Sequence, residues 1–392
     1  MKPLMAPLRL RSTGGGHRKV TWLELFFDLI FVAAVSQVAE PLRGDYSMAG
    51  LVRFVPLFGL IWWAWAGHTS FSTRFDTDDT VQRLLTLLQM FAVAAMAANA
   101  RDALDSRSSA GFAAAYAVVR FFLVAQYVRA RSVPDAQSLA GHYLAGHGFA
   151  AVLWLLSAFV EAPERFAVWA VAFVIDLGTP WLAVRHNVKV PPDAAHLPER
   201  FGLFTLILLG ETMVAVMQGM ESQEDWTPAA ATSAFLGMGV SFLIWWWYFD
   251  GVSGAAEQPV RTKRDAVRFH LWSYAHFPLY LGIVVVGVGI QRIVMAASRA
   301  TLTADDAIIL TCGAALLMFA MTVIEVASVG RKPNHSSTSI AWSVALGITM
   351  LALGWIVKDS GSPVVMIVVM VSLCTAQLAV SLSGKVMVVP AG

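Results

Sequence analysis

Two carboxylates lie four residues apart in the first apolar stretch of the chain. Glu24 and Asp28 stand in the run 22–32, and side chains at positions i and i+4 occupy the same face of a helix, where like charges repel. An ionised group inside a membrane costs about 2.5–3.5 kcal/mol on insertion scales. We therefore predict that the pair binds a proton or a monovalent cation reversibly. In the alternative, Glu24 lies at the interface, where a capping or salt-bridge contact merely orients the helix.

A further carboxylate, Glu211, stands alone in a later apolar stretch. It follows Glu199 by twelve residues, roughly 18 Å along a helix at 1.5 Å per residue, which would place it near the middle of a bilayer. Gly210 before it lets another backbone or a ligand come close. We predict that Glu211 serves a substrate, an ion or a proton. The alternative is a static ion pair with an arginine of another helix.

Asp176 precedes the segment Gly178-Thr179-Pro180, where the proline removes a backbone hydrogen-bond donor. The pattern predicts a broken helix at membrane depth, and unwound segments of this kind commonly coordinate cations or substrates. The alternative is a proline-kinked helix in which Asp176 is paired with Arg120.

One arginine and one histidine complete the candidate set. Arg200, at the start of a later span, could pair with Asp28 or Asp250, and His276 with its neighbouring tyrosines could belong to a proton relay. We assign the other histidines of the apolar runs to interfacial or packing roles; these are His68, His142 and His147. The candidate substrate- or ion-binding residues are thus Glu24, Asp28, Asp176, Arg200, Glu211 and His276, with no catalytic residue and no metal ligand assigned.

Motifs of common enzymes are missing from the sequence. There is no nucleophile elbow, no phosphate-cradling glycine loop, no pair of histidines at i and i+4, and no CxxC. We expect no cofactor and consider an enzyme the weaker reading. An intramembrane lipid-modifying enzyme, with Asp and His from different spans meeting at the interface, stays open.

Composition fixes the environment in which these residues act. The 392 residues are 57% hydrophobic and only 14% charged, and the mean hydropathy is +0.63. Such a chain is solvated by a lipid bilayer, and this composition excludes soluble enzymes and nucleic-acid-binding proteins.

The sequence predicts an all-α, polytopic bundle of about twelve transmembrane spans. They are expected at 22–40, 51–70, 82–99, 111–128, 142–160, 165–184, 201–220, 230–249, 269–290, 305–328, 337–357 and 363–383.

Lys and Arg indicate the orientation, because basic residues resist translocation. With the N-terminus inside, most of the 28 basic residues fall in the inner segments. We therefore expect both termini in the cytoplasm of a bacterium, with a flexible tail over 1–19 and a second tail over 387–392.

Two correspondences suggest a duplication. The run 61–67 resembles 244–250, and 25–30 resembles 202–207. We predict six-span repeats over 20–190 and 200–386, joined by a linker at 191–199; because six is even, both repeats would have the same orientation.

Four blocks together resemble the bacterial low temperature requirement A family: Trp22–Val32, His196–Phe204 leading to Leu209-Gly210-Glu211, Trp246–Asp250, and Tyr274-Ala275-His276. The resemblance implies a polytopic inner-membrane protein named for a cold-growth phenotype, without a settled biochemical activity. A fainter likeness links the first span to potassium channels built from two six-span repeats, which we treat as an analogy.

We predict that the chain transports a small solute, a proton or a monovalent cation. The intramembrane carboxylates would change protonation as access alternates. A cation channel with Phe27, Phe31 and Phe204 at a hydrophobic constriction is one alternative, and a sensor or assembly role in membrane adaptation is another. A homodimer is left open.

Overall fold

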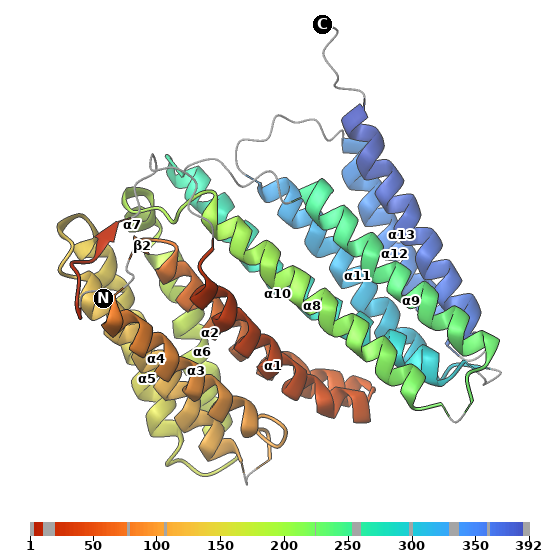
Figure 1. Cartoon of the computed structure of the whole chain (residues 1–392), viewed down its shortest axis with the longest axis horizontal. Coiled ribbons are helices and arrows are strands. Elements are labelled where there is room, and N and C mark those ends of the chain that lie inside the picture. The colour runs from red at the N-terminus through yellow and green to blue at the C-terminus, as the bar shows by residue number, and fades with distance from the viewer. Residues whose placement is uncertain are drawn as a thin grey trace, which may run out of the picture. The chain divides into compact units, whose positions relative to one another are not determined.

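The computed structural model describes residues 4–10, 20–76, 79–105, 108–223, 225–252, 260–297, 301–328, 337–358 and 361–386 (Figure 1). These residues form almost only helices: α1 (Trp22–Gly44), α2 (Met48–Ser72), α3 (Thr80–Ala98), α4 (Ser109–Ala130), α5 (Gln137–Ser157), α6 (Glu164–Leu182), α7 (Val184–Lys189), α8 (His196–Glu221), α9 (Pro228–Trp246), α10 (Lys263–Met295), α11 (Ala304–Ala327), α12 (Ser337–Val357) and α13 (Pro363–Val386). A 3₁₀ helix, η1 (Pro134–Ala136), precedes α5, and a π-helix, η2 (Trp247–Val252), extends α9.

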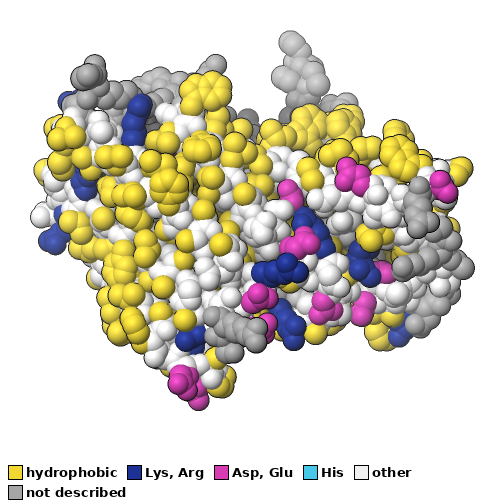
Figure 2. Space-filling view, turned by 60° about the horizontal axis from the view of Figure 1, so that its bottom comes forward, with side chains coloured by type: hydrophobic (Ala, Val, Ile, Leu, Met, Phe, Trp, Pro, Cys, Tyr) yellow, Lys and Arg dark blue, Asp and Glu magenta, His cyan; other side chains and the backbone are white. Residues whose placement is uncertain are grey.

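Within these described ranges, twelve helices are long and apolar enough to cross a membrane. Each coincides with a predicted span, so the expected all-α polytopic bundle is confirmed. Large apolar side chains on these helices point outward, among them Phe91, Val174, Phe235 and Ile356. Figure 2 shows hydrophobic side chains over much of the face in view, as expected of a surface that lipid solvates.

Two helices of unit 2 begin at threonines that supply capping acceptors. Thr227 and Thr303 cap α9 and α11, each accepting a hydrogen bond from a backbone N–H in the first turn. Pro228 stands at the first position of α9, where its missing N–H costs nothing. The starts of α9 and α11 therefore follow from ordinary helix chemistry.

The chain divides into two compact units. Unit 1 comprises Met1–Pro41, Arg53–Arg200 and Glu257–His270, and unit 2 comprises Leu42–Val52, Phe201–Ala256 and Leu271–Gly392. The division at residue 200 lies within α8, and α1, α2 and α10 also carry residues of both units. The duplication itself stays a prediction.

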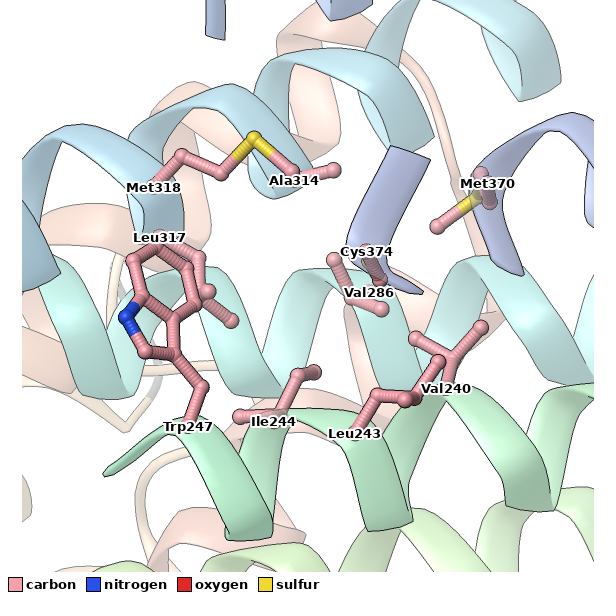
Figure 3. A pocket seen from close by; sticks show the side chains of 10 residues that line it. All are labelled: Val240, Leu243, Ile244, Trp247, Val286, Ala314, Leu317, Met318, Met370 and Cys374. Carbon is pink, nitrogen blue, oxygen red and sulfur yellow. The ribbon is translucent and has the colours of Figure 1, made fainter. Parts of the chain in front are cut away.

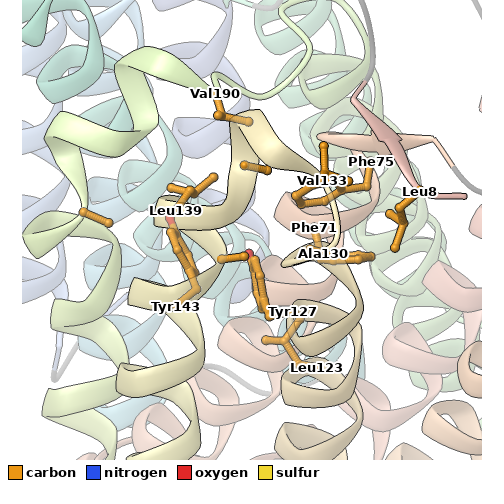
Figure 4. Packing of buried hydrophobic residues seen from close by; sticks show 13 residues of the cluster. Leu8, Phe71, Phe75, Leu123, Tyr127, Ala130, Val133, Leu139, Tyr143 and Val190 are labelled. Atoms are coloured by element: carbon orange, nitrogen blue, oxygen red, sulfur yellow. The ribbon is translucent and has the colours of Figure 1, made fainter.

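In unit 1, α4 packs between α3 and α5, and α6 packs on α5. One end of this unit holds a buried cluster of apolar and aromatic side chains that includes Phe71, Tyr127, Tyr143 and Leu8 (Figure 4). In unit 2, α12 packs on α11, and α13 packs on both α9 and α12. Glycines let helices of unit 2 approach closely; a Cβ on Gly282 of α10 would stand 2.9 Å from the carbonyl oxygen of Gly313 in α11.

Leu4–Leu10 are ordered, contrary to the flexible tail that we predicted over 1–19. Strand β1 (Arg9–Leu10) pairs antiparallel with β2 (Phe75–Asp76), with Leu10 opposite Phe75. Leu8 is buried in the cluster of Figure 4. The remaining tail residues 1–3 and 11–19, and the predicted tail 387–392, lie outside the described residues.

Asp79 fastens this N-terminal segment to the rest of unit 1. As the N-cap of α3 it accepts from the backbone N–H of Gln82 at 2.8 Å, and it also accepts from the N–H of Ala6 at 2.7 Å and from Arg129. Burial alone would raise the pKa of Asp79, but these hydrogen bonds and the Arg129 charge outweigh it and hold the pKa below its usual value.

Contacts between connecting segments agree with spans that alternate in direction. The N–H of Asp193 donates to the carbonyl of Thr73 across the four spans α3–α6 of unit 1, and the N–H of Leu302 donates to the carbonyl of Gly361 across α11 and α12 of unit 2. An even number of spans separates the partners in each case. Both members of each pair therefore lie on the same side of the membrane.

Candidate functional site

Asp28 of α1 and Arg200 of α8 form a fully buried ion pair in unit 1. Arg200 Nε donates to Asp28 Oδ2 at 3.0 Å, and Arg200 Nη2 donates to Oδ1 at 2.6 Å. The indole of Trp65 in α2 also donates to Oδ1, at 2.7 Å. All three side chains are 0% exposed. The predicted pairing of Arg200 with Asp28 is thus confirmed, and Asp250 is instead the acceptor of Trp246.

Glu24 extends the pair into a four-residue ionic cluster, made of Glu24, Asp28, His196 and Arg200. Its Oε1 lies 3.4 Å from Arg200 Nη1 and 3.2 Å from His196 Nε2. At the same time Glu24 accepts from the N–H of Thr21 at 2.8 Å while Thr21 Oγ1 accepts from the N–H of Glu24, which is a capping box. The capping and salt-bridge contacts of our alternative reading are therefore present.

The charges of the ionic cluster do not cancel without a proton. Two carboxylates face one permanent cation, Arg200, and the fourth member is a histidine whose charge depends on protonation. Neutrality requires one proton on His196 or on a carboxylate. A third carboxylate, that of Glu199, lies outside the cluster but 3.6 Å from His196 Nδ1, and its side chain is 43% exposed.

A second buried ionic group, which we call the triad, joins α4, α5 and α6. Arg120 Nη2 lies 2.6 Å from Asp176 Oδ1 and 3.1 Å from His147 Nδ1, and His147 Nδ1 lies 2.6 Å from the same Asp176 oxygen. All three side chains are buried. The pairing of Asp176 with Arg120 that we held as an alternative is present, and His147 is a member that we had assigned to packing.

Helix α6 continues unbroken through Pro180 to Leu182, so the broken helix predicted after Asp176 is wrong. Pro180 lies in the last turn and has no N–H to donate to the carbonyl of Asp176, so one hydrogen bond is missing there although the helix continues. The close approach of the helices instead comes from Gly146 of α5, where a Cβ would stand 2.2 Å from Thr179 Oγ1. Gly67 of α2 packs against Arg120 in the same way, its Cβ position lying 3.0 Å from Nη1.

Glu211 is paired in unit 2 with Arg43, whose Nη2 donates to Oε1 at 2.8 Å. Their side chains are 20% and 12% exposed. Glu211 is therefore not the lone carboxylate that we predicted, and the alternative of an ion pair with another helix is the one present. Whether it serves a solute stays a prediction.

His276 of α10 is held from both sides of its ring. Nδ1 lies 2.8 Å from the carbonyl of Trp272, and Nε2 lies 3.0 Å from Tyr248 Oη. Because a carbonyl only accepts, Nδ1 carries the hydrogen and Nε2 accepts from Tyr248. Tyr280 donates to the carbonyl of Phe201 at 2.8 Å rather than to His276. The predicted relay role is untested.

The aromatic residues of the channel alternative are fully buried. Phe27 stacks on His68 with ring centroids 3.9 Å apart and also contacts Phe31. In unit 2, Phe204 packs on Tyr280. These contacts are those of packed helices within each unit.

An apolar pocket lies in unit 2 between α9, α10, α11 and α13, with Trp247 of η2 at one side (Figure 3). Its lining is Val240, Leu243, Ile244, Trp247, Val286, Ala314, Leu317, Met318, Met370 and Cys374. No carboxylate, arginine or histidine stands among these residues. Over the described ranges no three His, Cys, Asp or Glu side chains lie close enough together to hold a metal ion.

The model of bacterial low temperature requirement A proteins (LtrA) matches residues 19–375. The chain belongs to this family. The LtrA match covers α1 through most of α13 and both ionic groups of unit 1. An uncharacterized protein of Rhizobium meliloti (strain 1021) is 30% identical over 295 residues, which are 71% of each chain. No solved structure matches this LtrA chain.

Sequence reasoning found the charged members of both ionic groups in this LtrA protein but missed their neutral partners. Trp65 was noted only as part of the run 61–67 that resembles 244–250, His147 was assigned to an interfacial or packing role, and His196 was given no role. The available signal was weak: Trp65 and His147 each stand within an apolar span, and only the rotation of neighbouring helices brings them to Asp28 and Asp176.

Proposed function

We propose that this protein moves a small solute or ion across the bacterial plasma membrane and couples that movement to proton binding at its buried carboxylate–arginine pairs. The observation that carries the proposal is the Asp28–Arg200 pair with its second carboxylate, Glu24. The distribution of basic residues along the sequence favours both termini in the cytoplasm.

Packing alone gives no reason for such a pair. The desolvation of two buried charges often exceeds their mutual attraction, and replacing a buried ion pair by apolar residues is often neutral or stabilising. Ionisable residues that persist inside a span mark proton, ion or substrate pathways. Asp28 and Arg200 lie in span helices at 0% exposure, which supports a role beyond stability.

The contacts suggest how a proton would act. A carboxylate of Asp28 can hold either the Arg200 guanidinium or a proton, and protonation removes the attraction that keeps the 2.6 Å contact. Arg200 would then be released toward Glu24 or toward an incoming solute. Alternating access needs two conformations, and a proton that breaks one ion pair would favour one conformation over the other.

The proposal is tested with purified full-length protein in sealed liposomes under an imposed potassium gradient with valinomycin, while internal pH is followed. Wild-type protein is expected to show a voltage-driven pH change, and Asp28→Asn is expected to lose most of it. Asp305→Asn is the matched control, because Asp305 is an exposed first-turn residue of α11. Equal pH changes in wild type and Asp28→Asn would reject Asp28 as the proton site.

A further inference from the structure

The triad of unit 1 is surrounded by hydrogen-bond donors that have no acceptor among the described residues. Arg120 uses Nη2 alone, and its Nε and Nη1 atoms have no partner. The hydroxyls of Tyr116 and Tyr127 and the indole nitrogen of Trp154 are also unpartnered. All of these side chains are 0% exposed. The one unpartnered acceptor of the triad is Asp176 Oδ2.

Helix geometry gathers these donors around Arg120. On α4, residues 116, 120 and 127 recur at spacings of four and seven and share one face. Tyr116 packs on Trp154 of α5 with ring centroids 4.4 Å apart, and Tyr127 lies 6.0 Å from the His147 ring. Guanidinium, phenol and indole N–H or O–H groups bind acceptors. A donor-rich, buried surrounding of this kind suits an anion.

The hydrogen at His147 Nδ1 fixes the charge of the triad. The 2.6 Å contact to Asp176 Oδ1 needs a hydrogen between the two atoms. With that hydrogen on Nδ1 and none on Nε2, the imidazole is neutral, Asp176 is ionised, and the 3.1 Å approach to Arg120 is electrostatic rather than a hydrogen bond. The triad then carries one positive and one negative charge and is neutral.

A buried site that begins neutral can take an anion only with a compensating cation. An anion alone would leave one net negative charge, and a proton alone, added at the second ring nitrogen of His147, would leave one net positive charge. Both states are costly at membrane depth, whereas binding the two together restores neutrality.

The charged or titratable groups that face His147 are Asp176 of α6, Arg120 and Tyr127 of α4, and Tyr143 of α5 itself.

We propose that the Arg120–His147–Asp176 triad binds one small monovalent anion together with one proton. Arg120 Nε and Nη1 would hold the anion, and His147 would take up the proton while Asp176 orients its ring. The anion must be small, because on the α2 side even a methyl group at Gly67 would stand 3.0 Å from Nη1. The transport consequence, an electroneutral symport of one anion with one proton, rests on the proposed function; the binding itself does not.

Binding is measured on the purified full-length protein by thermal unfolding, with nitrate and formate as probes and sulfate and gluconate as the divalent and bulky comparisons. Nitrate is expected to raise the unfolding temperature at about pH 5.5, with an apparent affinity at least roughly tenfold weaker at about pH 8, because each bound anion needs a proton. An equal response to nitrate and gluconate, or no dependence on pH, would overturn the proposal.

Two substitutions separate the roles within the triad. Asp176→Asn removes the negative charge, so the site is positive with a neutral imidazole, and we expect nitrate to bind at both pH values without needing the proton. Arg120→Gln is expected to abolish the nitrate response at both. Retention of the wild-type pH dependence in Asp176→Asn would count against the mechanism. If either variant fails to fold, the comparison of nitrate with gluconate on the wild-type protein still tests whether the site binds a small anion.

The transport arm uses liposomes with an inward nitrate gradient and no imposed voltage. The interior should acidify at the same rate whether or not valinomycin clamps the membrane potential, because one proton and one anion carry no net charge. Nitrate that fails to bind, together with a proton flux that depends on Asp28, would reject this inference and leave the proposed function standing. Nitrate that binds with pH dependence but drives no flux would reject transport and leave the site.

Discussion

Arg200 lies 172 positions after Asp28 and donates to both of its carboxylate oxygens, at 3.0 and 2.6 Å. Within unit 1 the pair joins α1 to the first turn of α8, whose residues from Phe201 onward belong to unit 2. A protein cut at the predicted linker 191–199 would therefore lose the counter-charge of Asp28 along with the second half.

Arg200→Gln should destabilise the protein by about 3–5 kcal/mol, because it leaves Asp28 buried without its cation. The double variant Asp28→Asn/Arg200→Gln should recover most of that loss, since neither charge remains. Thermal unfolding in detergent measures both. Arg53→Gln, at an exposed position of α2, is the control and should change little. A double variant no more stable than Arg200→Gln would contradict the pairing.

Gly146→Ala should destabilise unit 1 by about 1–3 kcal/mol, because the new methyl group would overlap Thr179 where α5 crosses α6. Gly148→Ala is a matched control two residues along the same helix, where a Cβ meets nothing within 4 Å. That control should be neutral or slightly stabilising, since alanine is the better helix former. Combining Gly146→Ala with Thr179→Ala should relieve the overlap; equal effects of the two single glycine substitutions would argue against the close crossing.

The hydrogen bonds of Asp79 that hold Leu4–Leu10 to unit 1 should be lost in acid. The pKa of Asp79 is lowered in the folded protein, so its contribution to stability is fully present above the unfolded value of about 3.9 and is lost as pH falls through the lower folded value. Hydrogen exchange of the Ala6 amide measures this. The amide should be protected at about pH 6 in wild type and exposed in Asp79→Asn at the same pH.

The Arg43–Glu211 pair should contribute little to stability. Its side chains are partly exposed, and pairs of that kind are typically worth about 0.2–1 kcal/mol. A double-mutant cycle with Arg43→Gln and Glu211→Gln measures the coupling. Exchange of the two charges, Arg43→Glu with Glu211→Arg, should restore the stability that Glu211→Arg alone loses. A coupling several-fold larger would show that the pair is more deeply desolvated than its exposure indicates.

The spans were predictable because each needs only a run of apolar residues, and all twelve lie where the sequence indicated. The pairing of Arg200 with Asp28 was also within reach, because few buried cations were available to choose from. Glu211 was misjudged because α1 runs on through Pro41 to Gly44 and carries Arg43 along with it, whereas the predicted span stopped at 40.

His147 shows where sequence reasoning stops. Its place in the triad depends on how α5 is rotated against α4 and α6, and α5 approaches α6 closely where Gly146 faces Thr179. A single sequence reports which residues share a face of one helix. It does not report which faces of different helices meet.

The pairing of β1 with β2 constrains how the chain is made. Arg9 and Leu10 leave the ribosome first, but their partners Phe75 and Asp76 follow α1 and α2. The two strands can meet only after both of these helices have been inserted with their connecting ends on the correct side. The small sheet therefore forms only after α1 and α2 have been made, and its formation reports that these two helices cross the bilayer as a hairpin.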